Sequence, residues 1–201
     1  MRIAVSGFGP FGSDTYNPTE AMVQQLLKRD PDLRGQVFEV SRADVDQELP
    51  RWLDAENPDV LLSLGLAGGR TAMAIEAVAV NLVHFGIPDV RGHQPQSGFI
   101  ADDGPAAFLS GLDTDKAVSL WRDAQVPGYT SFSAGTYLCN YLFYRASQWM
   151  SARQDGGRAA FIHVPYSTVW VPNPARQASM EESRMVEGVE VLVRALRHGT
   201  L

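Results

Sequence analysis

The sequence is short of cysteine and of long apolar runs. Cys139 is the one cysteine in 201 residues. A single thiol cannot close a disulfide within the chain or build a cysteine-based metal cluster. No stretch approaches the roughly 18 consecutive apolar residues of a membrane-spanning helix. Glycine and proline also interrupt residues 1–12 too early for a secretory signal peptide. We therefore expect a cytoplasmic protein without a membrane partner.

Positive charge is also in deficit. Lys and Arg number 17 against 23 Asp and Glu, which gives a formal net charge of −6. Proteins that hold nucleic acid by neutralising phosphates carry an excess of basic residues instead, so no nucleic-acid partner is expected. Hydrophobic residues make up 45% of the chain, and 201 residues can bury a full core. Residues 1–201 are predicted to form a single domain.

Short apolar runs alternate with amphipathic stretches along the chain. Nearly continuous apolar runs are typical of strands buried on both faces, and they occupy residues 2–7, 59–65 and 159–165. Less regular runs predict further strands at residues 36–40 and 72–83. Helical patterns cover residues 17–29, 44–57, 113–124, 136–150 and 178–199. This alternation predicts an α/β protein, a three-layer sandwich whose mostly parallel central sheet carries helices on both faces.

Local signals mark the ends of several predicted helices. Asn17 precedes Pro18, a combination that favours a helix start. Pro50 suits the start of the second predicted helix better than its interior. Gly199 follows the last predicted helix as a stop. Residues 86–111 are rich in Gly, Pro and Asp, and so long a connection is expected to carry function or short irregular elements.

The first glycine-rich stretch resembles a dinucleotide-binding motif without its context. Gly7, Gly9 and Gly12 form G-x-G-x-x-G after the first predicted strand. In dinucleotide-binding folds these glycines open directly into a helix. Here Pro10 lies inside the turn, the helix starts only at Pro18, and no acidic residue ends the next predicted strand. A nucleotide-binding oxidoreductase is therefore disfavoured, although saturable binding of a nicotinamide dinucleotide would revive it.

Residues at the ends of two predicted strands are candidate ligand-binding positions. Phe8 and Phe11 follow the first strand, and ligands bind at the carboxyl edge of open α/β sheets. The same two rings could equally be core aromatics. Residues 65–70, GLAGGR, follow another predicted strand but lack the G-K-[ST] of a phosphate-binding loop. A tight turn explains them equally well.

Cys139 lies close to a predicted helix start. The residues Ser-Ala-Gly-Thr at 133–136 indicate that start, which puts Cys139 in the first helical turn. The helix dipole and the free N–H groups there lower the pKa of a thiol, and the same N–H groups could hold an oxyanion. Free cysteine is also among the most buried residue types, so a structural core cysteine is the alternative.

A histidine and an acid occupy apolar runs elsewhere. Burying His163 requires a hydrogen-bonded partner, and a buried Glu76 must be paired or it becomes neutral. An acid that orients an imidazole, which in turn deprotonates Cys139, would make a thiol hydrolase. A structural histidine and a solvent-facing glutamate are the alternatives. Asp102 and Asp103 are rival acids, although acids are common in such Gly-Pro turns.

The ordered motifs resemble those of the pyroglutamyl-peptidase I family, the pyrrolidone-carboxylate peptidases. The family's G-F-x-P-F-G followed by N-P, its G-x-A-G-G-R followed by E-x-x-A-x-N, its A-G-x-[FY]-x-C-N and its F-I-H-V-P are all present. They occupy residues 7–12 and 17–18, 65–70 and 76–81, 134–140, and 161–165. The matching blocks keep one order between residues 5 and 165, which makes the resemblance more specific than any single motif.

This resemblance implies a cysteine exopeptidase that acts on peptides with an N-terminal pyroglutamate. It implies Cys139 as the nucleophile, His163 as general base and then acid, and Glu76 as the residue that orients His163. It also implies an apolar pocket for the pyrrolidone ring, lined by Phe8, Phe11 and Leu138. No metal and no cofactor are implied, and the chain is expected to form a homodimer or homotetramer.

Two positions depart from the family pattern. Many relatives carry an arginine before I-P-D, where this chain has Gly86, and either Arg70 or Arg91 would have to replace it if activity is to be kept. Many bacterial relatives have glutamine where this chain has Leu66. These departures motivate an alternative function: a catalytically weak or inactive protein that binds a small cyclic amide on the same fold.

Overall fold

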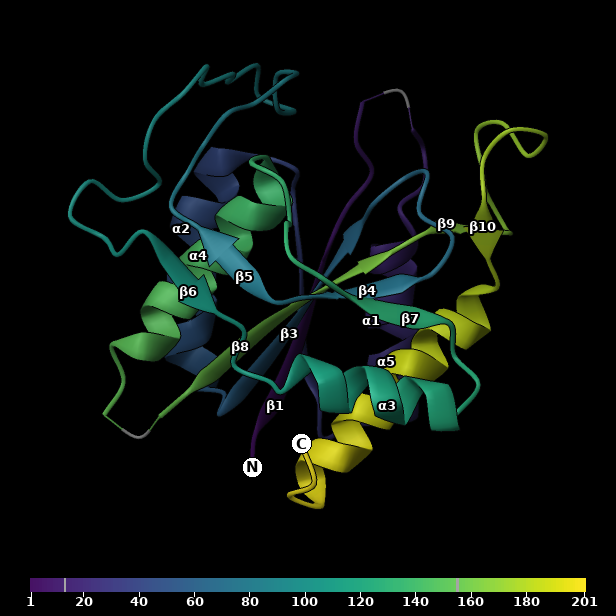
Figure 1. Ribbon diagram of the computed structural model, residues 1–201. Coiled ribbons are helices and arrows are strands. Elements are labelled where there is room, and N and C mark those ends of the chain that lie inside the picture. Colours follow the sequence, from purple (N-terminus) through teal and green to yellow (C-terminus); the bar gives the residue numbers. More distant parts are fainter. Residues whose placement is uncertain (13, 155) are drawn as a thin grey trace.

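The computed structural model describes residues 1–12, 14–154 and 156–201, and a central sheet lies between two helical layers (Figure 1). Within these residues the sheet has six strands in the order β2-β1-β3-β8-β4-β7. They are Arg34–Phe38 (β2), Ile3–Phe8 (β1), Val60–Leu66 (β3), Arg158–Val164 (β8), Met73–Glu76 (β4) and Gly128–Ser131 (β7). The first four are parallel, whereas β4 is antiparallel to β8 and parallel to β7. The predicted α/β fold with a mostly parallel sheet is confirmed.

Helices cover both faces of this sheet (Figure 1). One layer contains α1 (Pro18–Arg29), α3 (Thr114–Asp123) and α5 (Glu182–Arg197). The other contains α2 (Arg42–Glu56) and α4 (Leu138–Ser151). Helices of one layer pack against each other, and each layer forms its own apolar cluster with the sheet. In the first layer the indole N–H of Trp121 donates to the Gly188 carbonyl at 2.8 Å, which joins α3 to α5.

The three strands with continuous apolar runs are the buried centre of the sheet. All residues of β1, the first six of β3 and the last six of β8 are buried. Because helices cover both faces, every side chain of these strands leaves water whichever way it points. This is why their sequences lack the alternation of a half-exposed strand.

Helix α1 begins as predicted, and α2 covers nearly all of the predicted range of residues 44–57. The Asn17 side chain accepts a hydrogen bond from the Thr19 N–H at 3.0 Å, and Pro18 is the first helical residue. Pro50 does not mark a helix start, because α2 begins after Ser41 and holds Pro50 in its interior. The Ser41 hydroxyl caps the true start, and an interior proline removes one bond of the helical ladder without ending the helix.

The predicted strand at residues 72–83 is two strands in two sheets. Its second half, β5 (Val78–Val80), pairs with β6 (Ala107–Leu109) in a separate antiparallel sheet. Ala77 makes the change, since its N–H donates to Ser131 O at 2.7 Å and its carbonyl accepts from Ser110 N at 2.8 Å. An unbroken apolar run does not reveal a switch that is made by backbone bonds to distant segments.

The closing helix differs in detail from the sequence prediction, whereas the long connection agrees with it. The closing helix starts at Glu182 rather than at residue 178, because Ser179–Met180 form β10 beside β9 (Tyr166–Ser167). Residues 86–106 are irregular, as expected, and buried Asn81 ties them down by accepting from Ile100 N and donating to Ala101 O. Among the described residues, no helix has the length and apolar character needed to cross a membrane.

Candidate active site

Strand pairing brings His163 and Glu76 together. His163 lies near the end of β8 and pairs with Gly65 of β3 on one side and with Ala74 of β4 on the other. Glu76 is two residues beyond Ala74, so it lies on the same face of the sheet as His163. Nδ1 of His163 is 2.6 Å from Oε1 of Glu76, and both side chains are buried. The acid and the histidine therefore form a pair, and Glu76 does not face solvent.

The protonation state of this pair follows from its surroundings. Burial raises the pKa of Glu76, but the hydrogen bond from His163, the nearby Ser131 side chain and the charge of Arg70 outweigh it, so the net pKa is below its ordinary value. Burial lowers the pKa of His163, and the charge of Arg70 lowers it further against the opposing effect of Glu76. A neutral imidazole beside an ionised carboxylate must carry its proton on Nδ1. Its Nε2 is then free to accept a proton.

Cys139 lies in the first turn of α4, as predicted. The helix begins at Leu138, and its N-cap residue Tyr137 makes no side-chain cap, so the first N–H groups stay available. A β-carbon at Gly65 would lie 2.8 Å from the Cys139 sulfur. Because Gly65 is the strand partner of His163, the thiol lies over the backbone next to the imidazole. Glycine at this position leaves room for the sulfur.

The predicted lowering of the thiol pKa is wrong for the free protein. Burial raises the pKa of Cys139 to about 12, and the negative charge of Glu76 adds to this. The charge of Arg70 and the backbone N–H of Cys139 act in the opposite direction but do not prevail. The helix position contributes what the sequence indicated, yet burial decides the sign. The resting site holds a neutral thiol beside a neutral imidazole.

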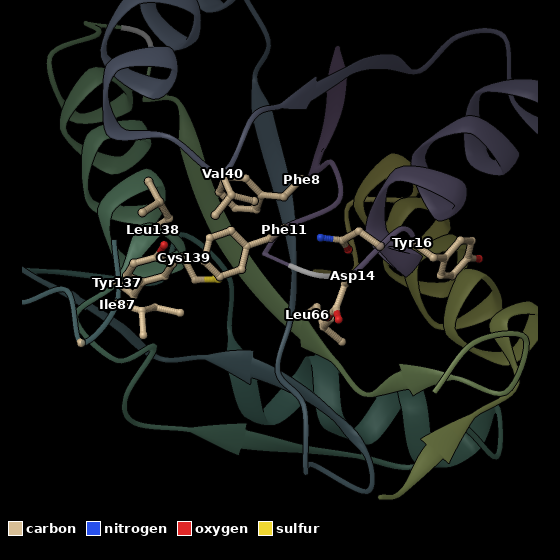
Figure 2. A pocket seen from close by; sticks show the side chains of 12 residues that line it. Phe8, Phe11, Asp14, Tyr16, Val40, Leu66, Ile87, Tyr137, Leu138 and Cys139 are labelled. Carbon is tan, nitrogen blue, oxygen red and sulfur yellow. The ribbon is translucent and has the colours of Figure 1, made fainter. Parts of the chain in front are cut away.

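An apolar cavity of about 490 Å³ opens beside the thiol. It is lined by Phe8, Phe11, Asp14, Tyr16, Asn17, Val40, Leu66, Gly86, Ile87, Tyr137, Leu138 and Cys139. Figure 2 shows Phe11, Tyr137, Ile87 and Leu138 gathered around the cysteine, with Asp14 and Leu66 on the opposite side. The predicted lining residues all contribute. The sequence did not predict Val40, Ile87 and Tyr137 as lining residues, although Ile87 and Tyr137 lie inside the I-P-D and A-G-x-[FY]-x-C-N motifs, which were the available signal.

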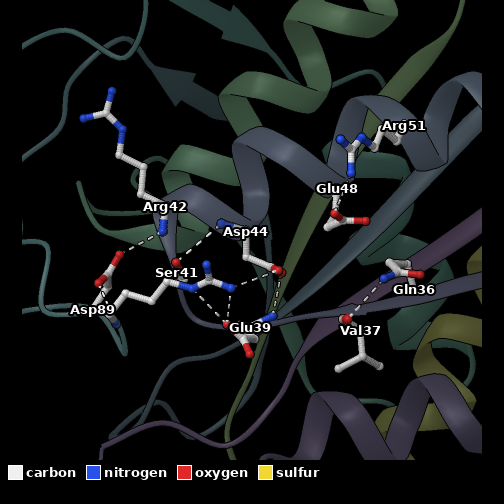
Figure 3. Close-up of polar contacts among 10 residues, drawn as sticks. Gln36, Val37, Glu39, Ser41, Arg42, Asp44, Glu48, Arg51 and Asp89 are labelled. Carbon is white, nitrogen blue, oxygen red and sulfur yellow. Dashed lines mark hydrogen bonds and ion pairs between the residues drawn. The ribbon is translucent and has the colours of Figure 1, made fainter.

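The cavity walls are fixed by local contacts. The Phe8 N–H donates to the Thr19 hydroxyl at 2.9 Å, and that hydroxyl donates to the Phe8 carbonyl at 3.1 Å. The Phe11 and Tyr137 rings lie 5.7 Å apart. On the far side, Asp89 accepts from the Arg42 N–H at 2.9 Å and ties the loop carrying Ile87 to the start of α2 (Figure 3).

The glycine-rich stretch after β1 serves packing. A β-carbon at Gly7 would lie 2.7 Å from the Thr19 carbonyl oxygen, so glycine permits the close approach of β1 and α1. The first turn of α1 is already occupied by the Asn17 side chain. The loop lines an apolar cavity, in agreement with the sequence argument against a dinucleotide site.

Of the remaining candidates, two aspartates and two arginines, only one residue belongs to the site. Asp102 and Asp103 are exposed and do not line the cavity. Arg91 pairs with Glu39 at 2.9 Å, whereas Arg70 pairs with Glu76 at 3.0 Å. Across residues 1–12, 14–154 and 156–201, no cluster of His, Cys, Asp and Glu could hold a metal ion. Of the two arginines considered, only Arg70 belongs to the site.

A thiol beside a carboxylate-oriented imidazole, at the wall of an apolar cavity, is the arrangement of a thiol hydrolase. The family model described as pyroglutamyl peptidase matches residues 1–198. This chain belongs to the pyroglutamyl peptidase family, which confirms the resemblance inferred from the motifs.

Similar sequences and solved structures agree with this family assignment. The chain is 39% identical over 169 residues to a pyrrolidone-carboxylate peptidase of Clavibacter michiganensis, covering 83% of this chain and 79% of the relative. It is 35% identical over 205 residues to that of Streptococcus pneumoniae, covering 98% and 92%. The pyrrolidone carboxyl peptidase of Thermococcus litoralis superposes with a TM-score of 0.91 at 31% identity, covering 98% of this chain and 95% of that one. A mutant of the Pyrococcus furiosus enzyme gives 0.92 at 30% identity over both whole chains.

Proposed function

We propose that this protein is a pyroglutamyl-peptidase I, a cysteine exopeptidase that hydrolyses the bond after an N-terminal pyroglutamyl residue. The observation that carries the proposal is the Cys139 thiol at the cavity wall, over Gly65, the strand partner of His163, whose Nδ1 is held by buried Glu76. Membership of the pyroglutamyl peptidase family supports the same activity.

The chemistry of the cavity suits this substrate. A pyroglutamyl ring is small, flat and uncharged, so aromatic and aliphatic walls such as Phe8, Phe11 and Leu138 can desolvate it at little cost. A blocked N-terminus has no ammonium group, and therefore no carboxylate is needed to hold one. The cavity of about 490 Å³ is larger than one five-membered lactam requires, which leaves room for the residue that follows.

The proposed reaction has two halves. In the first, His163 Nε2 takes the thiol proton as the Cys139 sulfur attacks the carbonyl that joins pyroglutamate to the next residue. The N–H groups at the start of α4 face the resulting oxyanion. The imidazolium then gives its proton to the leaving amine, and the C–N bond breaks to leave a thioester.

In the second half, water replaces the amine. His163 takes a proton from water as its oxygen attacks the thioester carbonyl, and the proton returns to the sulfur when the C–S bond breaks. Free pyroglutamate leaves. Throughout, Glu76 keeps the Nδ1 proton in place and stabilises the imidazolium. No step calls for a metal or a cofactor.

Gly86 and Leu66, the two residues that depart from the family pattern, both line the cavity. They motivated an inactive binding protein as the alternative. Neither residue belongs to the Cys139, His163 and Glu76 set, and the family relationship favours the enzyme.

Release of a fluorophore from a pyroglutamyl amide tests the function directly. We expect the wild type to turn the substrate over, and both Cys139→Ala and prior treatment with iodoacetamide to abolish turnover, because Cys139 is the only thiol. A wild type that binds the cyclic amide without cleaving it would establish the binding protein instead.

We also propose a cytoplasmic location and assembly into a homodimer or homotetramer. An unpaired thiol on which activity depends is compatible with a reducing compartment. Leu109, Phe132 and Val169 are large apolar side chains exposed on the single chain, which supports self-association. Sedimentation at several concentrations would give the size of the assembly, and a monomer at all of them would contradict this part.

A further inference from the structure

Arg70 shares one carboxylate oxygen with the histidine of the site. Its guanidinium nitrogen lies 3.0 Å from Oε1 of Glu76, and His163 Nδ1 lies 2.6 Å from the same atom. The Arg70 side chain is 22% exposed, whereas Glu76 has no exposure. This arginine does not line the cavity, so it acts on the reaction only through its neighbours.

The turn after β3 directs Arg70 to this position. Arg70 N donates to the Ala67 carbonyl at 3.3 Å, and Gly69 adopts φ +91°, which favours glycine. A β-carbon at Gly68 would lie 2.6 Å from the Tyr166 hydroxyl, so glycine is needed there as well. The G-G-R sequence is thus explained: two glycines fold the chain back so that the third residue meets Glu76.

Further contacts hold the guanidinium group in place. Its carbon lies 5.9 Å from the centre of the Tyr129 ring, and a second nitrogen is 3.5 Å from the Ser133 carbonyl oxygen. Ser133 belongs to the segment that leads into the helix of Cys139. The arginine therefore touches the acid of the site on one side and the approach to the nucleophile on the other.

We propose that Arg70 is a positioning residue that fixes the Glu76–His163 pair and keeps the imidazole in its neutral, proton-accepting form. This role rests on the proposed hydrolysis, in which His163 must accept the thiol proton.

The physical reason is the net charge of the buried site before and after His163 takes up a proton. With Arg70 present, its charge cancels that of Glu76, and a proton added to His163 creates a net positive charge in a buried site. Without Arg70, the same proton would neutralise the buried carboxylate and would be bound more tightly. Glu76 from β4 and Arg70 from the turn after β3 are the charged groups that act on His163. The titratable thiol of Cys139 from α4 lies over Gly65, the strand partner of His163. Glu76 and His163 titrate together, so the prediction concerns the pair.

The charge of Arg70 also acts on the nucleophile. It is a cause that lowers the pKa of Cys139 against the larger effect of burial. Removing the arginine would make the thiol harder to ionise at the same time as it made the base harder to keep neutral. Both effects reduce activity at neutral pH.

The test is the pH dependence of kcat/KM for Arg70→Met and Arg70→Lys on a pyroglutamyl amide. We expect the acid limb of Arg70→Met to move up by about one to two pH units, the effect of one charge at this distance, with KM little changed. Arg70→Lys keeps the charge but not both contacts, so its limb should lie between those of Arg70→Met and the wild type. If Arg70→Met does not fold, the pH profile of Arg70→Lys still tests the proposal.

Arg91→Met is the matched control. Arg91 is 52% exposed and pairs with Glu39 and with Asp44 of α2. Its loss should leave the pH profile unchanged. Arg70 variants that lose stability or raise KM while keeping the wild-type acid limb would show a merely structural role and overturn the proposal.

Alkylation of Cys139 by iodoacetamide gives a second readout that needs no substrate. Its rate against pH should shift to higher pH in Arg70→Met and not in Arg91→Met. If the wild type cleaved no pyroglutamyl amide, the proposed function would fail, but this shift would still support the effect of Arg70 on the pair and the thiol. If the rate of alkylation depended on pH in Arg70→Met as it does in the wild type, the proposed role of Arg70 would be rejected.

Discussion

The contact between Gly65 and Cys139 makes Gly65→Ala a sharp test of the site geometry. The added β-carbon would lie 2.8 Å from the Cys139 sulfur and 2.7 Å from the Phe161 ring. Favourable contacts between such atoms begin at about 3.5–4 Å, so each of the two contacts must lengthen by on the order of 1 Å. Phe161 is fully buried against the rings of Phe143 and His163, at centroid distances of 5.9 and 5.0 Å, so the ring can shift only together with its neighbours. The sulfur lies at the cavity wall and is the freer of the two groups, so we expect it to be displaced.

The substitution is expected to lower both the stability and the rate, for different reasons. An overpacked methyl group in a core costs about 1–3 kcal/mol of unfolding free energy. A displacement of about 1 Å in a reacting group costs about 10²-fold in rate. We therefore predict a folded Gly65→Ala protein whose kcat on a pyroglutamyl amide falls by about 10²-fold, with a modest drop in its urea midpoint and a smaller change in KM.

Gly35→Ala supplies the control. A β-carbon there would lie 2.6 Å from a Leu27 methyl, at the contact between β2 and α1 and outside the residues that line the cavity. This variant should lose some stability and keep its kcat. A folded Gly65→Ala protein with wild-type kcat would refute the placement of the thiol against β3.

Three further predictions follow. Glu76→Gln keeps the shape of the acid but loses its charge, so kcat should fall by about 10²–10⁴-fold at every pH in a steady-state assay. Asn140→Ala leaves the Val80 N–H and carbonyl without their bonds of 2.9 Å each, and chemical denaturation should show a loss of about 1–3 kcal/mol for each group that stays buried. The pKa of Cys139 is raised to about 12, so alkylation by iodoacetamide should still accelerate above pH 9, whereas a preformed thiolate would give a plateau.

The parts of the fold that the sequence predicts well are those where burial alone decides the pattern. β1, β3 and β8 are covered on both faces, and their continuous apolar runs follow directly from that. The break at Ala77 leaves no such mark, because it is made by backbone bonds to Ser110 and Ser131, which are more than thirty residues away in the sequence. The helix around Pro50 was predicted despite the proline, but its start is set by the Ser41 cap upstream and not by Pro50.

The residues of the candidate site also fall into those that the sequence predicts and those that it does not. Cys139, His163 and Glu76 could be predicted because each is a chemically active residue in an apolar context, where an unpartnered polar group is costly. Val40 and Tyr137 could not, since apolar cavity residues resemble core residues until the fold is known. The sign of the thiol pKa depends on burial and on Glu76, and neither can be read from the position of a cysteine in a helix.

Trapping the acyl-enzyme tests the central claim most directly. The protein would be mixed rapidly with a pyroglutamyl ester, quenched in acid, digested and examined by mass spectrometry. We predict a pyroglutamyl group on the peptide that contains Cys139, and its absence after treatment with iodoacetamide. Turnover that leaves no adduct on Cys139 and survives iodoacetamide would contradict the account.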